Sequence, residues 1–234
     1  RVSTTLALYD ANLNQIDSSI AELRYELMSS LGTRNSPSLQ GMVESSYYDV
    51  HAALNATEGG IPLFAGSQTD KMPMVPATLA EFAATPADQV FVNDQVRHTS
   101  RVAEGVDMKF GIGASDVASN LMPAFKTLAD AGPFGEVLTD DQMDAIRVAL
   151  HQLDEGLRDV RTINGANGRQ QVQAETYLDR AADREILLTK VIGDVEDADL
   201  AQVAYNISQR QTILEASYSV FAQLSSLSLT RYLD

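Results

Sequence analysis

Residues 194–234 of the chain read DVEDADLAQVAYNISQRQTILEASYSVFAQLSSLSLTRYLD. Apolar side chains recur there every seven residues in two neighbouring rows: Leu200, Ile207, Leu214 and Phe221, and Ile213, Val220 and Leu227. This period predicts one long helix with a broad apolar stripe. The sequence stays apolar to its end, at Leu229, Tyr232 and Leu233, where chain termini are usually polar. We therefore expect another helix or another subunit to cover the stripe.

The composition excludes several classes of protein. The 234 residues include 32 acidic and 17 basic side chains, a formal charge of -15, so we expect neither a nucleic-acid partner nor a membrane partner. No run of about 18 apolar residues and no charged-then-apolar leader is present, which predicts neither a membrane anchor nor a Sec signal. The absence of cysteine excludes disulfides, thiolate nucleophiles and thiolate metal sites.

The first part of the chain predicts an antiparallel helical hairpin over residues 3–58. Its first helix has the alternating spacing of three and four that is typical of a coiled-coil seam: Leu6, Tyr9, Leu13, Ile16, Ile20, Leu23 and Leu27. Gly32 is expected to close this helix in the left-handed conformation. Ser36 and Pro37 are expected to begin the second helix, which Gly59 and Gly60 would end.

Residues 61–114 have a different texture, because prolines and glycines break any helical period. Residues 89–92 and 101–110 show the alternation of short strands, with a turn or bulge at Glu104 and Gly105. We expect a small β subdomain inserted between helices.

Helical signals return near Ser115, a candidate cap, and Pro123 is expected to bend that helix or delay its start. Gly132 and Pro133 would end it. Thr139 and Gln142 then have the spacing of a capping box, which opens a long helix. Its apolar rows continue to about residue 192, a rod of roughly 75 Å at about 1.5 Å per residue.

The long helix carries a polar section at Asn164, Asn167 and Gln171, flanked by two glycines. Polar seam residues fix register, and a local break in the helix is the alternative interpretation. Gly193 is expected to interrupt the rod before the terminal helix.

The resulting fold class is mainly α, a long coiled-coil-like helical rod with a small inserted β subdomain. We divide the chain into a helical hairpin (1–60), the β-rich insertion (61–114), a helix pair with the long rod helix (115–193) and the terminal amphipathic helix (194–234). The predicted rod seam consists of Leu6, Leu13, Ile16, Ile20, Leu23, Leu27, Leu150, Leu153, Leu157 and Val160.

Two separated stretches resemble the flagellin superfamily. Residues 194–234 contain that family's acidic DAD start, its IL-x-A-S core at residues 213–217 and its closing SL-x-x-x-L at residues 228–233. Residues 54–70, LNATEGGIPLFAGSQTD, are similar to the link between helices and β domain in its hook-associated branch. A weaker similarity lies at residues 163–165.

The resemblance implies a flagellin-type rod in an extracellular structural protein, exported through the flagellar channel without a cleaved leader. It implies a ring at the junction of hook and filament, whose partners are further copies of the chain, hook-associated protein, flagellin and an export chaperone. It assigns the terminal stripe to an inner-tube helix with this assembly interface: Leu200, Val203, Ile207, Leu214, Phe221 and Leu224. Since such proteins begin with a further terminal helix, we expect Arg1 to lie partway along the first rod helix, in a fragment or a truncated homologue.

Two alternatives to a junction protein stay open. One is a flagellin that forms the filament itself. The other is a flagellin-like surface protein whose β insertion binds a polysaccharide or a receptor, which would need exposed aromatic rings among Phe64, Phe82, Phe91 and Phe110.

We predict no catalytic residues, no cofactor and no metal site. His51, His98 and His151 are scattered, and none has the spacing of an HExxH motif. Serine is plentiful, but no GxSxG motif marks one as a nucleophile.

Overall fold

The computed structural model describes residues 2–226. The chain divides into two compact units, Arg1–Leu178 and Asp179–Asp234. The apolar residues predicted at the very end of the chain, from Leu227 to Leu233, lie outside the described residues.

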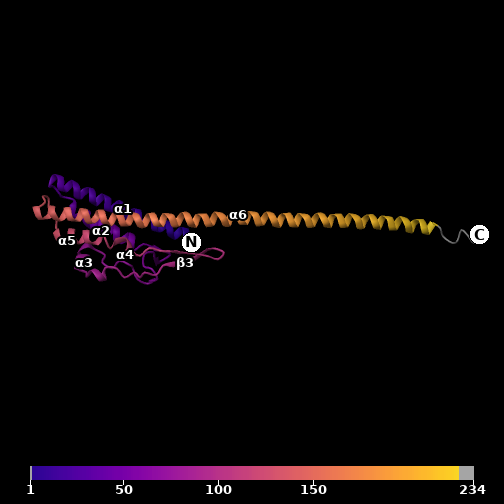
Figure 1. Cartoon of the computed structure of the whole chain (residues 1–234), viewed down its shortest axis with the longest axis horizontal. Coiled ribbons are helices and arrows are strands. Elements are labelled where there is room, and N and C mark those ends of the chain that lie inside the picture. The colour runs from indigo at the N-terminus through magenta and orange to yellow at the C-terminus, as the bar shows by residue number, and fades with distance from the viewer. Residues whose placement is uncertain (1, 227–234) are drawn as a thin grey trace, which may run out of the picture. The chain divides into compact units, whose positions relative to one another are not determined.

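The first unit is built on three long helical segments: α1 (Val2–Thr33), α2 (Leu39–Leu54) and the beginning of α6 (Asp140–Ser226). Figure 1 shows α1 alongside the first part of α6. α1 and α2 are antiparallel, because Ser19 contacts Ser46 (3.2 Å) while Ser38, at the start of α2, donates to Glu26 (2.9 Å). The seven predicted apolar residues of α1 are at most 1% exposed, so the predicted coiled-coil face is the core of this unit.

The corner between α1 and α2 differs from the prediction. The left-handed residue is Arg34 (φ 58°), not Gly32, and α2 begins at Leu39 after Ser38. Ser36 does not cap α2, because its hydroxyl donates to the carbonyl of Gly135 (2.8 Å). The Ser36 hydroxyl, which the sequence analysis assigned to the start of α2, therefore bonds to a residue far along the chain instead.

The glycine pair after α2 also has a different role. α2 ends at Leu54, and Gly59 (φ 59°) and Gly60 (φ 87°) form the turn between β1 (Thr57–Glu58) and β2 (Ile61–Pro62). Both positive φ angles suit a tight hairpin turn, which glycine adopts at little cost.

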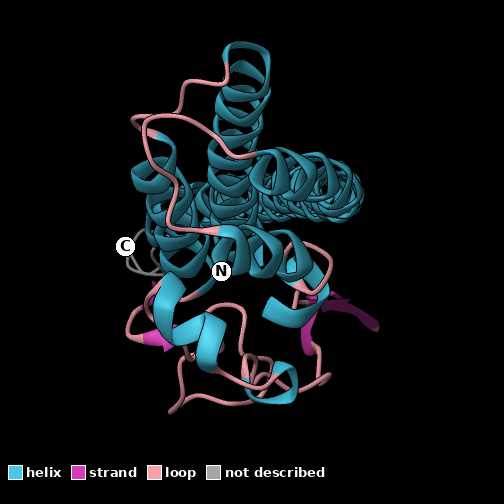
Figure 2. Cartoon of the chain, turned by 90° about the vertical axis from the view of Figure 1, so that its left-hand side faces the viewer, coloured by secondary structure: helices cyan, strands magenta, loops and turns pink. Residues whose placement is uncertain are grey.

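The insertion contains α3 (Leu79–Ala84), the short 3-10 helix η1 (Ala87–Gln89), β3 (His98–Ala103) and β4 (Val106–Phe110). β3 and β4 pair antiparallel around Gly105 (φ 72°), which confirms the predicted turn. The predicted strand at residues 89–92 is wrong, since only an isolated bridge from Met74 to Phe91 forms there. Figure 2 shows these loops and strands grouped on one side of the helices.

Two buried tyrosines fasten the insertion to the helices. Tyr9 of α1 donates to the carbonyl of Leu63 (2.7 Å), and Tyr47 of α2 donates to the carbonyl of Pro76 (2.8 Å). Burial raises the pKa of both phenols above the ordinary value, so both hydroxyls stay protonated donors.

Two short helices, α4 (Ala114–Ala118) and α5 (Met122–Ala131), lead from the insertion to α6. Pro123 lies in the first turn of α5 and Gly132 follows its end, as predicted. Ser115 is not a cap, because the carboxylate of Asp116 accepts from the N–H of Gly113 instead (3.0 Å).

α6 begins with the predicted capping box. The N–H of Gln142 donates to the hydroxyl of Thr139, and the N–H of Thr139 donates to the side chain of Gln142, both at 3.2 Å. The helix continues for 87 residues, so the breaks considered at the glycines near Asn164 and at Gly193 are absent. The predicted class, mainly α with a small β insertion, is confirmed. Within residues 2–226, no helix combines the length and the apolar character needed to cross a bilayer.

Candidate assembly interface

The first unit covers the predicted rod seam almost completely. Nine of its ten side chains are buried: Leu6, Leu13, Ile16, Ile20, Leu23, Leu27, Leu153, Leu157 and Val160. Leu150 is half-buried and packs against the same core. The first part of α6 is therefore buried against other helices of the same chain.

Polar contacts beside the seam set the pairing of α1 with α6. Arg24 pairs with Asp154 (2.6 Å), and Asp17 pairs with Arg161 (2.6 Å). As the residue number falls along α1 it rises along α6, so the two helices are antiparallel. The sequence analysis did not use these pairs, although Asp17 and Arg24 stand seven residues apart beside the seam, which is the spacing of flanking ion pairs in coiled coils.

The predicted polar section of the seam contacts α1 directly. The side-chain amides of Asn167 (2.9 Å) and Gln171 (3.0 Å) both donate to the carbonyl of Leu6, and Asn164 donates to Asn14 (3.0 Å). Asn167 is buried, so this contact holds one alignment of the two helices rather than a range of them.

The second unit presents the opposite picture. All six residues of the predicted assembly interface are exposed, from 47% at Val203 to 71% at Phe221: Leu200, Val203, Ile207, Leu214, Phe221 and Leu224. The second apolar row, at Ile213 and Val220, is exposed to a similar degree. The structure therefore leaves both apolar rows of the second unit open to solvent.

The histidines lie apart from one another. His51 contacts Asn55 (2.8 Å), His98 lies against the ring of Phe110, and His151 is 3.8 Å from Glu155 at the surface. In the part of the chain that the structure describes, no group of three or more potential metal-ligating side chains is found.

The insertion offers no aromatic platform in the described residues. Phe64, Phe82 and Phe110 are buried, and Phe91 is half-buried. Phe64 packs edge-on against Tyr9 and Phe82 packs against Tyr47, so these rings serve the core.

Residues 150–233 match the family model of the bacterial flagellin C-terminal helical region. This part of the chain is similar to the C-terminal region of flagellins. The match includes both the seam residues Leu153, Leu157 and Val160 and the exposed stripe of the second unit. No curated protein sequence matches the chain significantly.

Three solved structures share the fold. One, from Vibrio parahaemolyticus and described as a flagellar hook-associated protein, is 18% identical with a TM-score of 0.65, and the alignment covers 82% of this chain and 86% of that one. Bacillus cereus FlgL is 12% identical with a TM-score of 0.60, over 79% and 92% of the chains. Xanthomonas campestris FlgL is 10% identical with a TM-score of 0.66, over 82% and 94%. At these identities the likeness shows the fold.

Proposed function

We propose that the chain is a structural, self-assembling subunit of the bacterial flagellum that joins the hook to the filament. One observation carries this proposal: the flagellin C-terminal region holds an apolar stripe that the chain itself leaves exposed. The hook-associated protein and the FlgL proteins that share its fold support the junction rather than another part of the flagellum.

The mechanism is geometric. Burying a large apolar side chain stabilises an assembly by about 1.5–3 kcal/mol, and the stripe offers six such side chains in each subunit. In a closed assembly every subunit repeats the same contact, so a small gain at each interface is multiplied around the ring. The buried seam of the first unit keeps the rod rigid while the stripe makes the contacts.

The partners follow from this role. They are further copies of the chain and the neighbouring flagellar axial proteins, namely hook-associated protein and flagellin, together with an export chaperone. The location is extracellular, on the flagellum, after export without a cleaved signal peptide. The role needs no catalytic residue and no cofactor.

The experiment is a charge placed in the stripe of the chain in its own cells. Leu214→Asp or Phe221→Asp should abolish incorporation, because a carboxylate cannot be buried without a partner. The matched control is Ser219→Asp, which adds the same charge on the opposite face of the same helix and should incorporate normally. Normal filaments in Leu214→Asp cells would refute the assignment of the stripe.

A filament subunit is the second candidate, because the matching family model is that of flagellin. Seeded polymerisation separates the two. A flagellin extends indefinitely on filament seeds, whereas a junction protein adds a limited number of subunits and stops. Binding of a polysaccharide has less support, because the aromatic rings of the insertion are occupied in the core.

A further inference from the structure

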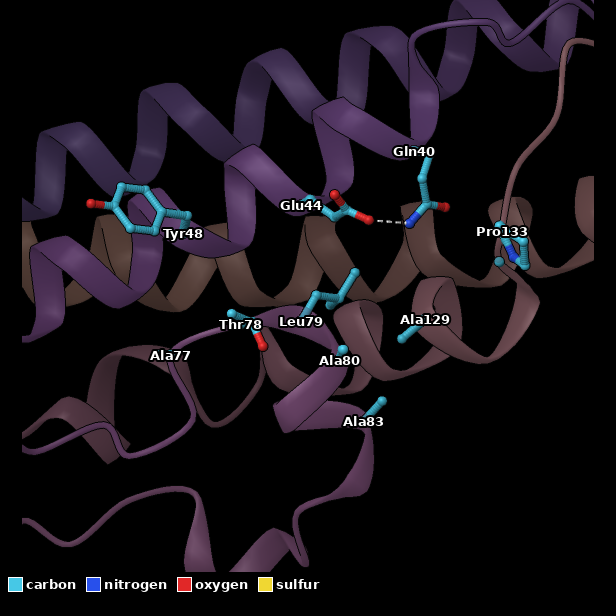
Figure 3. Close-up of a pocket in the computed structure, with 11 residues that line it drawn as sticks. Gln40, Glu44, Tyr48, Ala77, Thr78, Leu79, Ala80, Ala83, Ala129 and Pro133 are labelled. Atoms are coloured by element: carbon cyan, nitrogen blue, oxygen red, sulfur yellow. Dashed lines mark hydrogen bonds between the residues drawn. The ribbon is translucent and has the colours of Figure 1, made fainter.

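A groove of about 560 Å³ lies between α2, α3 and the end of α5 (Figure 3). Glu44 is the one charged side chain among the described residues that line it, and its exposed carboxylate already accepts from the side chain of Gln40 (2.6 Å). A single exposed carboxylate identifies no ligand. The polar section of the rod, from Asn164 to Gln171, carries a more specific chemistry.

Both Asn-Gly pairs of the sequence lie in this polar section, at Asn164-Gly165 and Asn167-Gly168. Every other asparagine is followed by a residue that has a side chain. Asparagine loses ammonia most readily before glycine, because glycine leaves its own backbone nitrogen free to approach the asparagine side chain. The sequence therefore concentrates one reaction, deamidation, at the place where α6 contacts α1.

The reaction takes place within the chain. The backbone nitrogen of Gly168 attacks Cγ of Asn167, a new N–Cγ bond forms, and the Cγ–Nδ2 bond breaks to release ammonia. Solvent water then opens the succinimide ring that results. Opening at one carbonyl gives aspartate, and opening at the other gives isoaspartate, so the balance needs water and no oxidant or reductant.

The folded rod withholds both reacting groups. In a helix each N–H donates to the carbonyl four residues earlier, so the nitrogen of Gly168 is engaged. The amide nitrogen of Asn167 donates to the carbonyl of Leu6 (2.9 Å), and this side chain is only 2% exposed. Its Oδ1 has no hydrogen-bond partner within residues 2–226, so the bond to Leu6 fixes the side chain. Cyclisation therefore requires α6 to open locally and to separate from α1.

The products of the reaction oppose closure. A carboxylate at position 167 has no N–H to donate to the carbonyl of Leu6, and it brings a charge into a buried place. Arg97 lines the same small cavity as Asn167, but its charge is already paired with Asp116. Isoaspartate also adds a carbon atom to the backbone, which moves Gln171 away from its own bond to Leu6.

We propose that Asn167 is a deamidation site that reacts only while the first unit is open, and that the reaction hinders such a chain from closing again. Chains that pair α1 with α6 are protected by the pairing itself. Chains that stay open lose the donor on which the pairing depends. The proposal rests on the first unit alone, so it stands or falls independently of the junction role.

The experiment is incubation of the purified chain at mildly alkaline pH, followed by peptide mass spectrometry for the exchange of NH₂ for OH. In guanidinium chloride the unfolded chain should react at Asn167, whereas Asn120, which precedes leucine, should stay intact. In buffer the folded chain should react at least about tenfold more slowly, because a buried hydrogen bond must break first. Equal rates in the two conditions would overturn the proposal.

Gly168→Ala tests the chemistry of the site. The added methyl group has nothing within 4 Å, so the fold should tolerate it. In guanidinium chloride this variant should react on the order of tenfold more slowly, because alanine lacks the backbone freedom of glycine. An unchanged rate would contradict attack by the backbone nitrogen.

Three further variants test the link to folding. Ile16→Ala, which leaves a cavity in the first unit, should speed the reaction in buffer on the order of tenfold or more, whereas the matched Ile207→Ala in the second unit should not. Asn167→Asp supplies one product directly and should lower the folding equilibrium constant about fivefold or more. An unchanged rate in Ile16→Ala, or unchanged folding of Asn167→Asp, would overturn the proposal.

Discussion

The seam of α1 and the stripe near the end of α6 have the same kind of sequence and opposite surroundings. Leu13, Ile16 and Ile20 are fully buried in the first unit, whereas Ile207, Leu214 and Phe221 are 52–71% exposed in the second. A heptad pattern therefore identifies the apolar face of a helix, but it does not identify the partner that buries this face. In the first unit the chain supplies its own partner. In the second, we propose, the flagellum does.

The strongest way to break this comparison is to shorten one side chain in each region. Ile16→Ala should lower the free energy of unfolding of the first unit by about 2–5 kcal/mol, because it leaves a cavity in the core. The matched change Ile207→Ala should alter the stability of the isolated chain by less than about 0.5 kcal/mol. Urea denaturation followed by circular dichroism measures both. A similar loss in the two variants would mean that the stripe is already covered in the isolated chain.

Removing a polar contact from the buried seam tests whether alignment depends on it. Asn167→Ala takes away the donor to the Leu6 carbonyl in a buried place and should cost about 1–3 kcal/mol. Gln202→Ala, which removes an exposed amide of the second unit that contacts Asn206, serves as the control and should cost almost nothing. An unchanged unfolding midpoint for Asn167→Ala would show that the alignment does not depend on this bond.

Two glycines of α6 sharpen the contrast in packing. A methyl group at Gly156 would collide with the side chain of Leu121, 2.7 Å from its Cγ, and lie 3.1 Å from the carbonyl of Asn120. Gly156→Ala should therefore destabilise the first unit by roughly 0–2 kcal/mol, since overpacking costs about 1–3 kcal/mol and the gain in helix propensity returns up to about 1.

Gly193 has nothing within 4 Å of the same methyl position. Gly193→Ala should therefore raise helix stability by up to about 1 kcal/mol. Hydrogen exchange of the flanking amides follows both substitutions. Stabilisation by Gly156→Ala would mean that Leu121 yields more easily than its burial suggests.

The smallest expected change in stability comes from an ion pair at the exposed edge of the seam. Asp17→Asn removes the charge that pairs with Arg161, a contact whose side chains are 31% and 60% exposed, so the cost should be about 0.2–1 kcal/mol. The loss should shrink further in high salt, because screening already weakens an exposed pair. Asp144→Asn, which breaks a pair within α6 only, is the control, and thermal unfolding at two salt concentrations separates them.

Features that depend on helical periodicity or on a local hydrogen bond could be predicted from the sequence. The face of α1, the capping box at Thr139 and the late start at Pro123 depend on spacing over a helix or on one local bond, and each is present. The stripe of α6 was recognised in the same way. Its role as an interface stays a prediction, because an isolated chain cannot supply the partner.

Features decided by distant contacts were not accessible. Ser36 has the form of a helix cap, yet its hydroxyl goes to Gly135, far along the chain. Gly59 and Gly60 have the form of a helix end, yet their positive φ angles serve the turn of a hairpin whose first strand begins three residues after the helix. Glycine and serine indicate that a turn, a helix end or a cap is near. The rest of the fold decides which of these forms.

Three contacts in which a side chain of α1 meets a side chain of α6 have the same spacing on the two helices. From Arg24 to Asp17 to Asn14 the chain moves by seven and then three residues, and so does its partner from Asp154 to Arg161 to Asn164. Deleting one residue of α6 between the first two contacts would turn both later partners, Arg161 and Asn164, about 100° away from α1. These contacts therefore survive a change in length only where both helices gain or lose the same whole number of heptads, so the paired segment changes length in discrete steps.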